Sequence, residues 1–163
     1  MTSLSKEYLL KALMNLVPTE EQMKTIGLFI KTFKKDHSAI LDAWMFVYER
    51  SSAYHRLNML YLANEIMQTT RDADAYSVEL KIAFKTAVLK VFEQTKQAVV
   101  GNAHLYKKYC ELENVWIQRN VMGVESCGLD LPELIRNIER AFGDKTRLCG
   151  VLEDALVRIR SGQ

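Results

Sequence analysis

Apolar residues recur at spacings of three and four along most of the chain, which is the pattern of helices that each bury one face. The first stretch of this kind spans about residues 5–16 and ends before Pro18, because a residue that precedes proline disfavours the α region. The second spans about residues 19–33, where Thr19 and Gln22 have the spacing of a capping box. Two helices joined by a short turn are therefore predicted first.

The same periodicity continues after residue 36 with short interruptions. The further helices that it predicts span about residues 38–48, 53–70, 73–100, 104–120, 131–143 and 145–160. Ser38 is the expected cap of the third helix, and Asp72 or Asp74 that of the fifth. No linker between these helices is long enough to separate two domains, so a single domain over residues 1–163 is expected.

Composition favours an all-α fold. Of the 163 residues 48% are hydrophobic and 26% are charged, as in a globular domain with a sizeable core. The first 100 residues contain one glycine, Gly27, and one proline, Pro18. A sheet protein would need a turn signal about every 8 to 12 residues. One glycine and one proline in 100 residues therefore disfavour strands.

Charge and reactive side chains exclude several functions. A formal net charge of +2 is too balanced for a general nucleic-acid coat. Cys110, Cys127 and Cys149 are odd in number and form no C-x-x-C pair, which is typical of reduced intracellular thiols. Histidines are scattered and no catalytic motif is present, so we expect no metal, no cofactor and no enzyme activity. No apolar run is long enough for a membrane span.

The helix over residues 53–70 carries an unusual polar stripe. Its apolar arc holds Met59, Leu62, Ala63, Ile66 and Met67, and the opposite arc holds Leu57, Tyr61, Asn64, Glu65 and Gln68. Amides both donate and accept backbone hydrogen bonds, and tyrosine adds rigid contact area, so this arc suits the recognition of a peptide. The alternative interpretation is a half-buried helix that packs these polar side chains against its neighbour.

The helix over residues 104–120 has a second mixed arc. It contains Lys108, Leu112, Val115 and Arg119, with Tyr109 and Trp116 beside it on the apolar side. Two cations separated by aliphatic residues are suited to hold a phosphate beside an apolar anchor. A solvated edge with aliphatic stems lying on the surface remains the alternative.

Both stripes resemble the signatures of one family, the CTD-interacting domain, which binds the C-terminal heptad repeats of RNA polymerase II. Residues 60–68, L-Y-L-A-N-E-I-M-Q, are similar to its first signature, L-Y-L-A-N-D-V-x-Q, and residues 114–121, N-V-W-I-Q-R-N-V, are similar to its second, x-I-W-x-x-R-x-V. The resemblance covers roughly residues 4–122. It is closest to the L-Y-L-A-N subgroup of termination and polymerase-phosphatase regulators.

The resemblance implies a right-handed superhelix of seven to eight helices, like ENTH and VHS domains, with a groove between the second, fourth and seventh. One additional short helix is then expected between Val91 and Asn102. The implied ligand is an extended Tyr-Ser-Pro-Thr-Ser-Pro-Ser segment that ends in a β-turn, and the implied location is the nucleus. RNA-processing or phosphatase complexes are implied as further partners.

The family's site residues carry over to positions on the two stripes. Tyr61 and Asn64 would contact the peptide backbone, Glu65 would accept from the heptad tyrosine hydroxyl, and Val115 would line the tyrosine pocket. Arg119 would lie on the phosphate side with Lys108 near it. The full set of candidate peptide-binding residues is Tyr61, Asn64, Glu65, Gln68, Lys108, Glu111, Val115 and Arg119.

Two positions depart from the family pattern. Glu65 stands where the family has Asp, so its carboxylate lies one methylene further out. Glu111 stands where phosphoserine-reading members have Arg, and a carboxylate beside a phosphate repels it by about 1 kcal/mol at a few ångströms in water-like dielectric. Lys108, one turn away, is the candidate substitute.

Two other classes of function stay open at this point. A membrane-trafficking adaptor is one, since Lys31, Lys34 and Lys35 form a modest basic cluster, although no basic amphipathic helix precedes the fold. A structural scaffold is the other, in which both polar stripes contact helices of the same chain. In that case Asn64→Ala would destabilise the fold.

Overall fold

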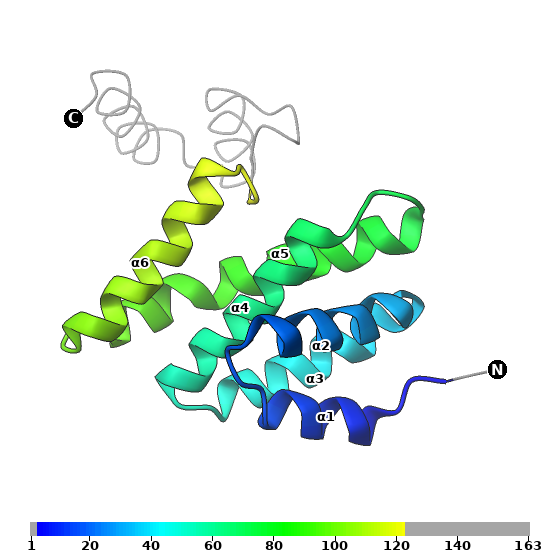
Figure 1. Cartoon of the computed structure of the whole chain (residues 1–163), viewed down its shortest axis with the longest axis horizontal. Helices are drawn as coiled ribbons and strands as arrows, with labels where there is room; N and C mark the ends of the chain where they lie inside the picture. Colours follow the sequence, from blue (N-terminus) through cyan, green and yellow to red (C-terminus); the bar gives the residue numbers. More distant parts are fainter. Residues whose placement is uncertain (1–2, 123–163) are drawn as a thin grey trace, which may run out of the picture. The chain divides into compact units, whose positions relative to one another are not determined.

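The computed structural model describes residues 3–122 (Figure 1). The chain divides into two compact units, residues 1–122 and residues 123–163, and the description below concerns the first. The loop and the two helices expected after Gly123 lie outside the described residues. A single domain over residues 1–163 and a total of seven or eight helices therefore stay predictions.

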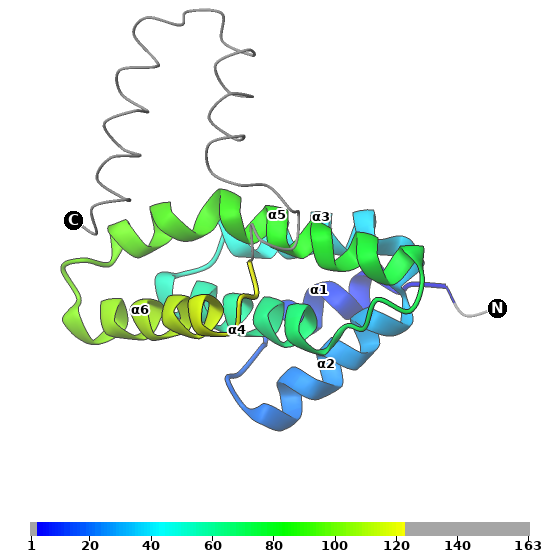
Figure 2. The ribbon, with the colours of Figure 1, turned by 90° about the horizontal axis from the view of Figure 1, so that it is seen from above.

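All regular secondary structure in the described residues is helical, and they contain no strand, which confirms the all-α fold class. Their elements, in chain order, are α1 (Lys6–Met14), α2 (Glu20–Thr32), the 3-10 helix η1 (Lys34–Asp36), α3 (His37–Glu49), α4 (Ala53–Thr69), α5 (Ala75–Ala98) and α6 (Ala103–Gln118). All six α-helices lie within a few residues of the bounds that periodicity predicts. α5 is the longest and runs along the length of the described unit (Figure 2).

The predicted caps of α2 and α5 are confirmed. Thr19 Oγ1 accepts from the Gln22 backbone N–H at 3.3 Å, and Asp74 Oδ1 accepts from the Ser77 N–H at 2.8 Å. Gln22 Oε1 accepts from the N–H of Val17 at 2.6 Å, which is two residues earlier than a standard capping box would have it. A hydrogen bond from Lys34, followed by the one from Ser77 N–H, lowers the pKa of Asp74 to about 2.

Two sequence-based expectations are wrong. α3 begins at His37 directly after η1, with Asp36 as its N-cap and without a side-chain cap bond, so Ser38 lies inside the first turn. Because η1 continues directly into α3, the capping position falls on Asp36, the last residue of η1, and not on Ser38. The additional short helix between Val91 and Asn102 is not formed within this described stretch, because α5 continues to Ala98 and no breaker precedes Gly101.

Aromatic side chains of α3 hold the core together. Trp44 is fully buried, stacks on Tyr48 with ring centroids 4.9 Å apart, and meets Phe84 of α5 edge-on at 6.1 Å. Trp44 Nε1 donates to the Met59 carbonyl of α4 at 3.2 Å, and the Tyr48 hydroxyl lies 2.6 Å from Thr95 Oγ1 of α5. The polar ends of both rings therefore connect α3 to α4 and α5.

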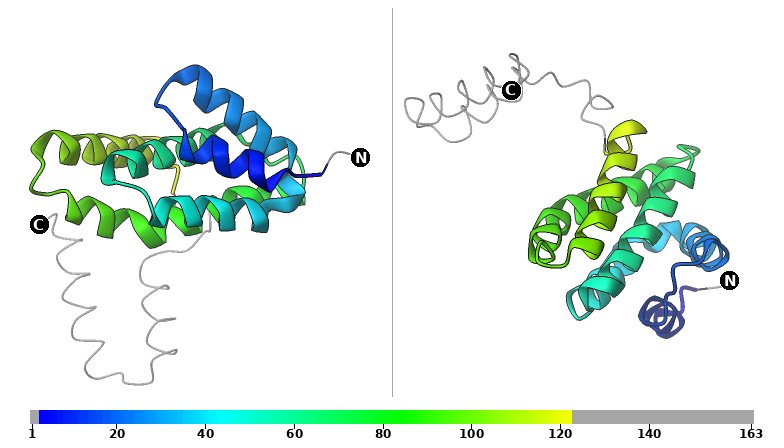
Figure 3. Two further views of the ribbon diagram at one scale, coloured as in Figure 1. Left: turned by 90° about the horizontal axis from the view of Figure 1, so that it is seen from below. Right: turned by 60° about the vertical axis from the view of Figure 1, so that its left-hand side comes forward.

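α4 contacts α2, α5 and α6, and it lies alongside α6 (Figure 3). The two helices run parallel, since the Tyr109 hydroxyl donates to the carbonyl of Ala53 at the start of α4, and Trp116, further along α6, donates to Asn64, further along α4. Lys31 Nζ of α2 donates to Thr69 Oγ1 of α4 at 2.8 Å. One side of α4 thus lies between α2 and α6.

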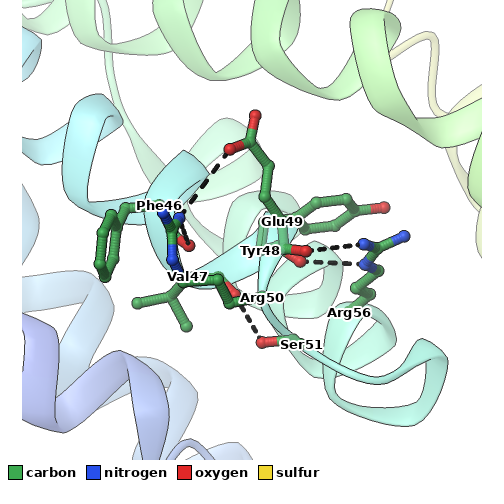
Figure 4. Close-up of polar contacts among 7 residues, drawn as sticks. All are labelled: Phe46, Val47, Tyr48, Glu49, Arg50, Ser51 and Arg56. Carbon is green, nitrogen blue, oxygen red and sulfur yellow. Dashed lines mark hydrogen bonds and ion pairs between the residues drawn. The ribbon is translucent and has the colours of Figure 1, made fainter.

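Arginine side chains satisfy carbonyls at the C-terminal end of α3 (Figure 4). Arg56, from the first turns of α4, donates through Nε to the Tyr48 carbonyl at 2.9 Å and through Nη2 to the Glu49 carbonyl at 3.0 Å. Arg50 donates to the Phe46 carbonyl at 3.0 Å, and its guanidinium lies over the Phe46 ring at 3.7 Å. The last carbonyls of a helix lack intrahelical partners, so Arg56 fixes the angle between α3 and α4.

Replacing Arg56 by alanine should therefore weaken the fold. We expect Arg56→Ala to lower the free energy of unfolding by about 1–3 kcal/mol, because it removes two charge-assisted hydrogen bonds from a partly buried position. Arg50→Ala is the matched control, with an expected loss of about 0.5–1 kcal/mol for an exposed cation–π contact. Urea unfolding followed by circular dichroism measures both. Equal losses for the two variants would contradict the role assigned to Arg56.

Candidate peptide-binding face

Four of the predicted site residues share the side of α4 that lies between α2 and α6. Tyr61, Asn64, Glu65 and Gln68 are all partly exposed, and they are called here the polar face of α4. Leu57, which periodicity placed on the same arc, is buried instead. The reason is that α6 covers α4 at this level, where Tyr109 reaches the carbonyl of Ala53 one turn earlier.

A chain of hydrogen bonds connects this face to α6. Asn64 Oδ1 accepts from Trp116 Nε1 at 2.9 Å and from Gln68 Nε2 at 2.5 Å. Gln68 Oε1 accepts from Arg119 Nη1 at 2.6 Å. The structure thus brings together Asn64, Gln68 and Arg119 of the predicted set. Trp116, which the sequence had marked only as an apolar neighbour, also belongs to this chain of hydrogen bonds.

The two ends of this chain fix the orientation of both amides. An indole N–H and a guanidinium can only donate, so Asn64 must present its oxygen to Trp116 and Gln68 must present its oxygen to Arg119. Gln68 uses both ends of its amide within the chain. Asn64 Nδ2 has no acceptor among the described residues, which leaves two oriented donor hydrogens on a partly exposed helix face.

Glu65 lies on the opposite edge of the polar face, toward α2. A Cβ atom built on Gly27 would stand 3.3 Å from Glu65 Cγ, so the glycine makes room for the glutamate stem. The pKa of Lys24 is raised chiefly by its bond to Glu20 and also, to a smaller degree, by the charge of Glu65. Sequence reasoning missed Gly27 as part of the site, although a lone glycine inside a helix was the available signal.

The charge of Glu111 acts on the polar face of α4. The pKa of Tyr61 is raised first by burial of the hydroxyl and second by the negative charge of Glu111, which places that carboxylate within electrostatic reach of the phenol. Glu111 is also 3.9 Å from Lys107 Nζ, one turn earlier on α6. The acid that replaces the family's arginine is therefore near the candidate site.

The remaining predicted residues of α6 are spread along the helix. Val115 is partly exposed next to the buried Trp116, whose ring packs on Phe92 of α5 with centroids 4.9 Å apart. Lys108 is partly buried and forms no hydrogen bond or ion pair with the described residues. It precedes Arg119 by three turns, or about 16 Å of helix, so the two cations lie at different points along the site.

Arg119 is held at the C-terminal end of α6 by a turn that the sequence did not predict. The Val121 N–H donates to the Trp116 carbonyl at 2.9 Å and the Asn120 N–H to the Ile117 carbonyl at 3.2 Å, which is the Schellman pattern. Asn120 adopts a φ of 50°, a left-handed conformation that asparagine tolerates. α6 therefore ends at Gln118 with Arg119 as its C-cap, and the bond from Arg119 to Gln68 places this end beside the end of α4.

The described residues offer no group of His, Cys, Asp and Glu side chains that could hold a metal ion. Among the helices of this part of the chain, none combines the length and the apolar character needed to cross a membrane. The candidate site consists instead of hydrogen-bonding and charged side chains on parallel helices. Such side chains can form hydrogen bonds and ion pairs with a bound ligand.

The fold and this face define a helical domain in which a polar, partly exposed helix face lies between two neighbouring helices. The family model for the CID domain matches residues 7–128 of the chain, which is well over half of it. The chain therefore belongs to the CID domain family.

Similar mammalian proteins have names that refer to the regulation of nuclear pre-mRNA. The mouse protein called Regulation of nuclear pre-mRNA domain-containing protein 2 is 30% identical over 103 residues, covering 63% of this chain and 6% of that protein. The mouse and human proteins called Regulation of nuclear pre-mRNA domain-containing protein 1B are each 24% identical over 125 residues, covering 77% of this chain and 37% of each relative. This chain thus corresponds to a minor part of the length of these relatives.

The position of Glu111 can be tested through Tyr61. Because a nearby negative charge disfavours tyrosinate, we expect Glu111→Gln to lower the pKa of Tyr61, while burial keeps that pKa above its ordinary value. NMR titration of ring-labelled tyrosine, with Tyr61→Phe to assign the signal, measures the shift. Glu113→Gln is the control, since Glu113 pairs with Lys96 and should leave Tyr61 unchanged. An unaltered Tyr61 pKa in Glu111→Gln would show that Glu111 points away from the face.

Proposed function

We propose that this domain binds the heptad-repeat C-terminal tail of RNA polymerase II along the polar face of α4, as a non-catalytic module in nuclear transcription termination or RNA 3′-end processing. Membership of the CID domain family supports this proposal, as do the relatives whose names refer to the regulation of nuclear pre-mRNA. The L-Y-L-A-N sequence of residues 60–64 further favours the subgroup of termination and polymerase-phosphatase regulators. RNA-processing or phosphatase complexes would be further partners.

The oriented amide of Asn64 carries the proposal. Its oxygen is occupied by Trp116 and Gln68, so its Nδ2 hydrogens are directed outward before any ligand arrives. A peptide in extended conformation has unpaired backbone carbonyls, which such a donor can bind. Because the side chain is already fixed, binding loses little rotamer freedom, and the hydrogen bond contributes more of its energy to affinity.

Tyr61, Glu65 and Val115 supply the remaining contacts of the proposed site. Tyr61 offers a rigid ring for the peptide backbone, and Val115 offers apolar surface for the heptad tyrosine. Glu65 accepts a hydrogen bond from the tyrosine hydroxyl, with Gly27 leaving space for the longer side chain. Lys24 and Lys31 lie on the side of α2 that faces α4, so the Glu65 carboxylate has positive charges in its vicinity.

The charge of Glu111 restricts which repeats this domain reads. It adds a negative charge near Tyr61, at the position where the resemblance implies an arginine in phosphoserine-reading members. A phosphate carries about −2 charge near neutral pH and is repelled there. We therefore expect the domain to favour repeats that are not phosphorylated on the first serine.

The first test separates binding from folding. Asn64→Asp keeps an oxygen for Trp116 and Gln68 but removes the Nδ2 donor, so we expect a near-normal melting temperature and at least about tenfold weaker binding of a two-repeat heptad peptide, the equivalent of one hydrogen bond. Fluorescence anisotropy with labelled peptide measures the dissociation constant. Gln94→Glu, an exposed amide-to-acid change on α5, is the control for added charge. Failure of the unaltered domain to bind any heptad peptide below the millimolar range would refute the proposal.

The second test addresses Glu111. Glu111→Arg should strengthen binding of a peptide phosphorylated on its first serine by about tenfold or more relative to the unmodified peptide, because repulsion is replaced by a charge-assisted hydrogen bond. Glu7→Arg makes the same change of charge at an exposed position on α1. If both variants strengthen binding equally, net charge and not position is responsible, and the role of Glu111 is disproved.

A further inference from the structure

A hollow of about 290 Å³ lies where the end of α1, the end of α3 and the start of α4 meet. Met14 of α1 and Phe46 of α3 contribute apolar lining. The polar lining contains one cation and no acidic side chain, and it consists of Arg50, Ser51, Ser52 and His55. None of these residues belongs to the proposed peptide site, so the hollow is a separate feature of the domain.

Two large apolar side chains are exposed at this hollow. Met14 is 62% exposed and Phe46 is 47% exposed, and they come from different helices. Single exposed apolar side chains are ordinary on a protein surface, whereas apolar surface that gathers from separate elements is typical of an interaction site. Methionine is flexible and contacts aromatic rings favourably through its sulfur. The hollow is therefore suited to receive one apolar side chain, and an aromatic one in particular.

Hydrogen bonds within the chain hold the polar wall of the hollow in place. His55 Nε2 donates to the Leu13 carbonyl at 2.8 Å, which connects the first turn of α4 to the end of α1. Ser51 Oγ donates to the Val47 carbonyl at 2.6 Å. Ser52 Oγ accepts from the His55 backbone N–H at 3.3 Å and so caps α4. Because these side chains are already ordered, a ligand loses little free energy in fixing them.

Among the described residues that line the hollow, Arg50 is the one with a permanent charge (Figure 4). Its guanidinium lies over the Phe46 ring at 3.7 Å and donates through Nη1 to the Phe46 carbonyl at 3.0 Å. Glu49 Oε2 is 4.0 Å from Nη1, and since both side chains are exposed this ion pair is weak. Arg50 Nε and Nη2 have no acceptor among the described residues. A planar guanidinium with free donors beside apolar surface is suited to bind a carboxylate.

We propose that this hollow binds a short acidic segment of a partner protein, with one apolar side chain between Met14 and Phe46 and a neighbouring carboxylate on Arg50. A cation next to apolar surface complements such a segment both in charge and in hydrophobicity. A small molecule matches the hollow less well, because small-ligand sites bury most of the ligand, whereas Met14 and Phe46 are about half exposed. The unmodified heptad Tyr-Ser-Pro-Thr-Ser-Pro-Ser has no carboxylate, so the partner is a different one.

The hollow and the polar face of α4 lie on different parts of that helix. His55, in the first turn, is bonded to α1, whereas the polar face, within residues 61–68, lies between α2 and α6. Six residues, about 9 Å of helix, separate His55 from Tyr61. A heptad peptide and the acidic segment therefore bind without excluding each other, and the assignment of the hollow does not depend on the proposed function.

The experiment titrates the isotope-labelled chain with three end-blocked peptides and follows NMR chemical shifts. The probe is Gly-Asp-Asp-Phe-Asp-Asp-Gly, and the two control peptides carry asparagine for every aspartate or serine for the phenylalanine. The probe should shift signals of residues 46–55 and the Met14 methyl, and it should bind about tenfold more tightly than either control peptide. Arg50→Glu should remove the advantage over the asparagine peptide. Arg71→Glu makes the same charge change at an exposed position outside the hollow and should keep that advantage.

Arg50→Gln, which keeps a side chain of similar length without the charge, is the second variant and should give an intermediate loss; circular dichroism shows that each variant is folded. No shifts with the probe at millimolar concentration, or equal affinity for the probe and the asparagine peptide, would overturn the assignment. Shifts on residues 61–68 in place of the hollow, or an equal loss in Arg71→Glu, would do the same. Binding of single-stranded RNA that is lost in Arg50→Glu would assign the hollow to another ligand. Heptad binding is measured separately and is unaffected by any of these results.

Discussion

The hydrogen bond from the Trp116 indole to Asn64 joins the core of this domain to its polar face. Trp116 is buried and packs on Phe92 of α5, so its N–H must find an acceptor inside the protein or lose the energy of a hydrogen bond. Asn64 supplies that acceptor and is oriented by doing so. Packing of α6 on α5 therefore sets the direction of an amide on α4, and the same contact serves stability and the candidate site.

This coupling reconciles two interpretations that periodicity left open. The polar stripe of α4 was consistent either with contacts inside the chain or with peptide recognition. The structure shows that the oxygen of Asn64 and both ends of the Gln68 amide are used internally, whereas the Asn64 Nδ2 group is not used by any described residue. One side chain can thus fulfil a structural role through its oxygen and a binding role through its nitrogen. The basic cluster on which an adaptor function depended is partly engaged, since Lys34 bonds Asp74 and Ser77.

The sequence predicted what depends on local pattern, and it failed where contacts between distant residues decide. Helix bounds followed from apolar spacing, and the caps Thr19 and Asp74 followed from side-chain chemistry. Ser38 was mistaken for a cap because nothing local marks the direct passage from η1 into α3. The network between Asn64 and Arg119 spans more than fifty positions, and the meeting of Met14, Phe46 and His55 at one hollow depends on how α1, α3 and α4 pack. Neither relation is visible in periodicity.

The contact between Gly27 and Glu65 shows how a departure from a family pattern can be accommodated. A glycine in the middle of a helix costs about 1 kcal/mol relative to alanine, so its place in α2 calls for a compensating reason. An alanine Cβ would stand 3.3 Å from Glu65 Cγ, which is closer than an ordinary van der Waals contact and would push the glutamate stem outward. A glutamate already carries its carboxylate one methylene further than an aspartate. By removing the Cβ on the facing helix, Gly27 lets the stem of Glu65 lie back against α2, so that the longer side chain does not have to project from the face.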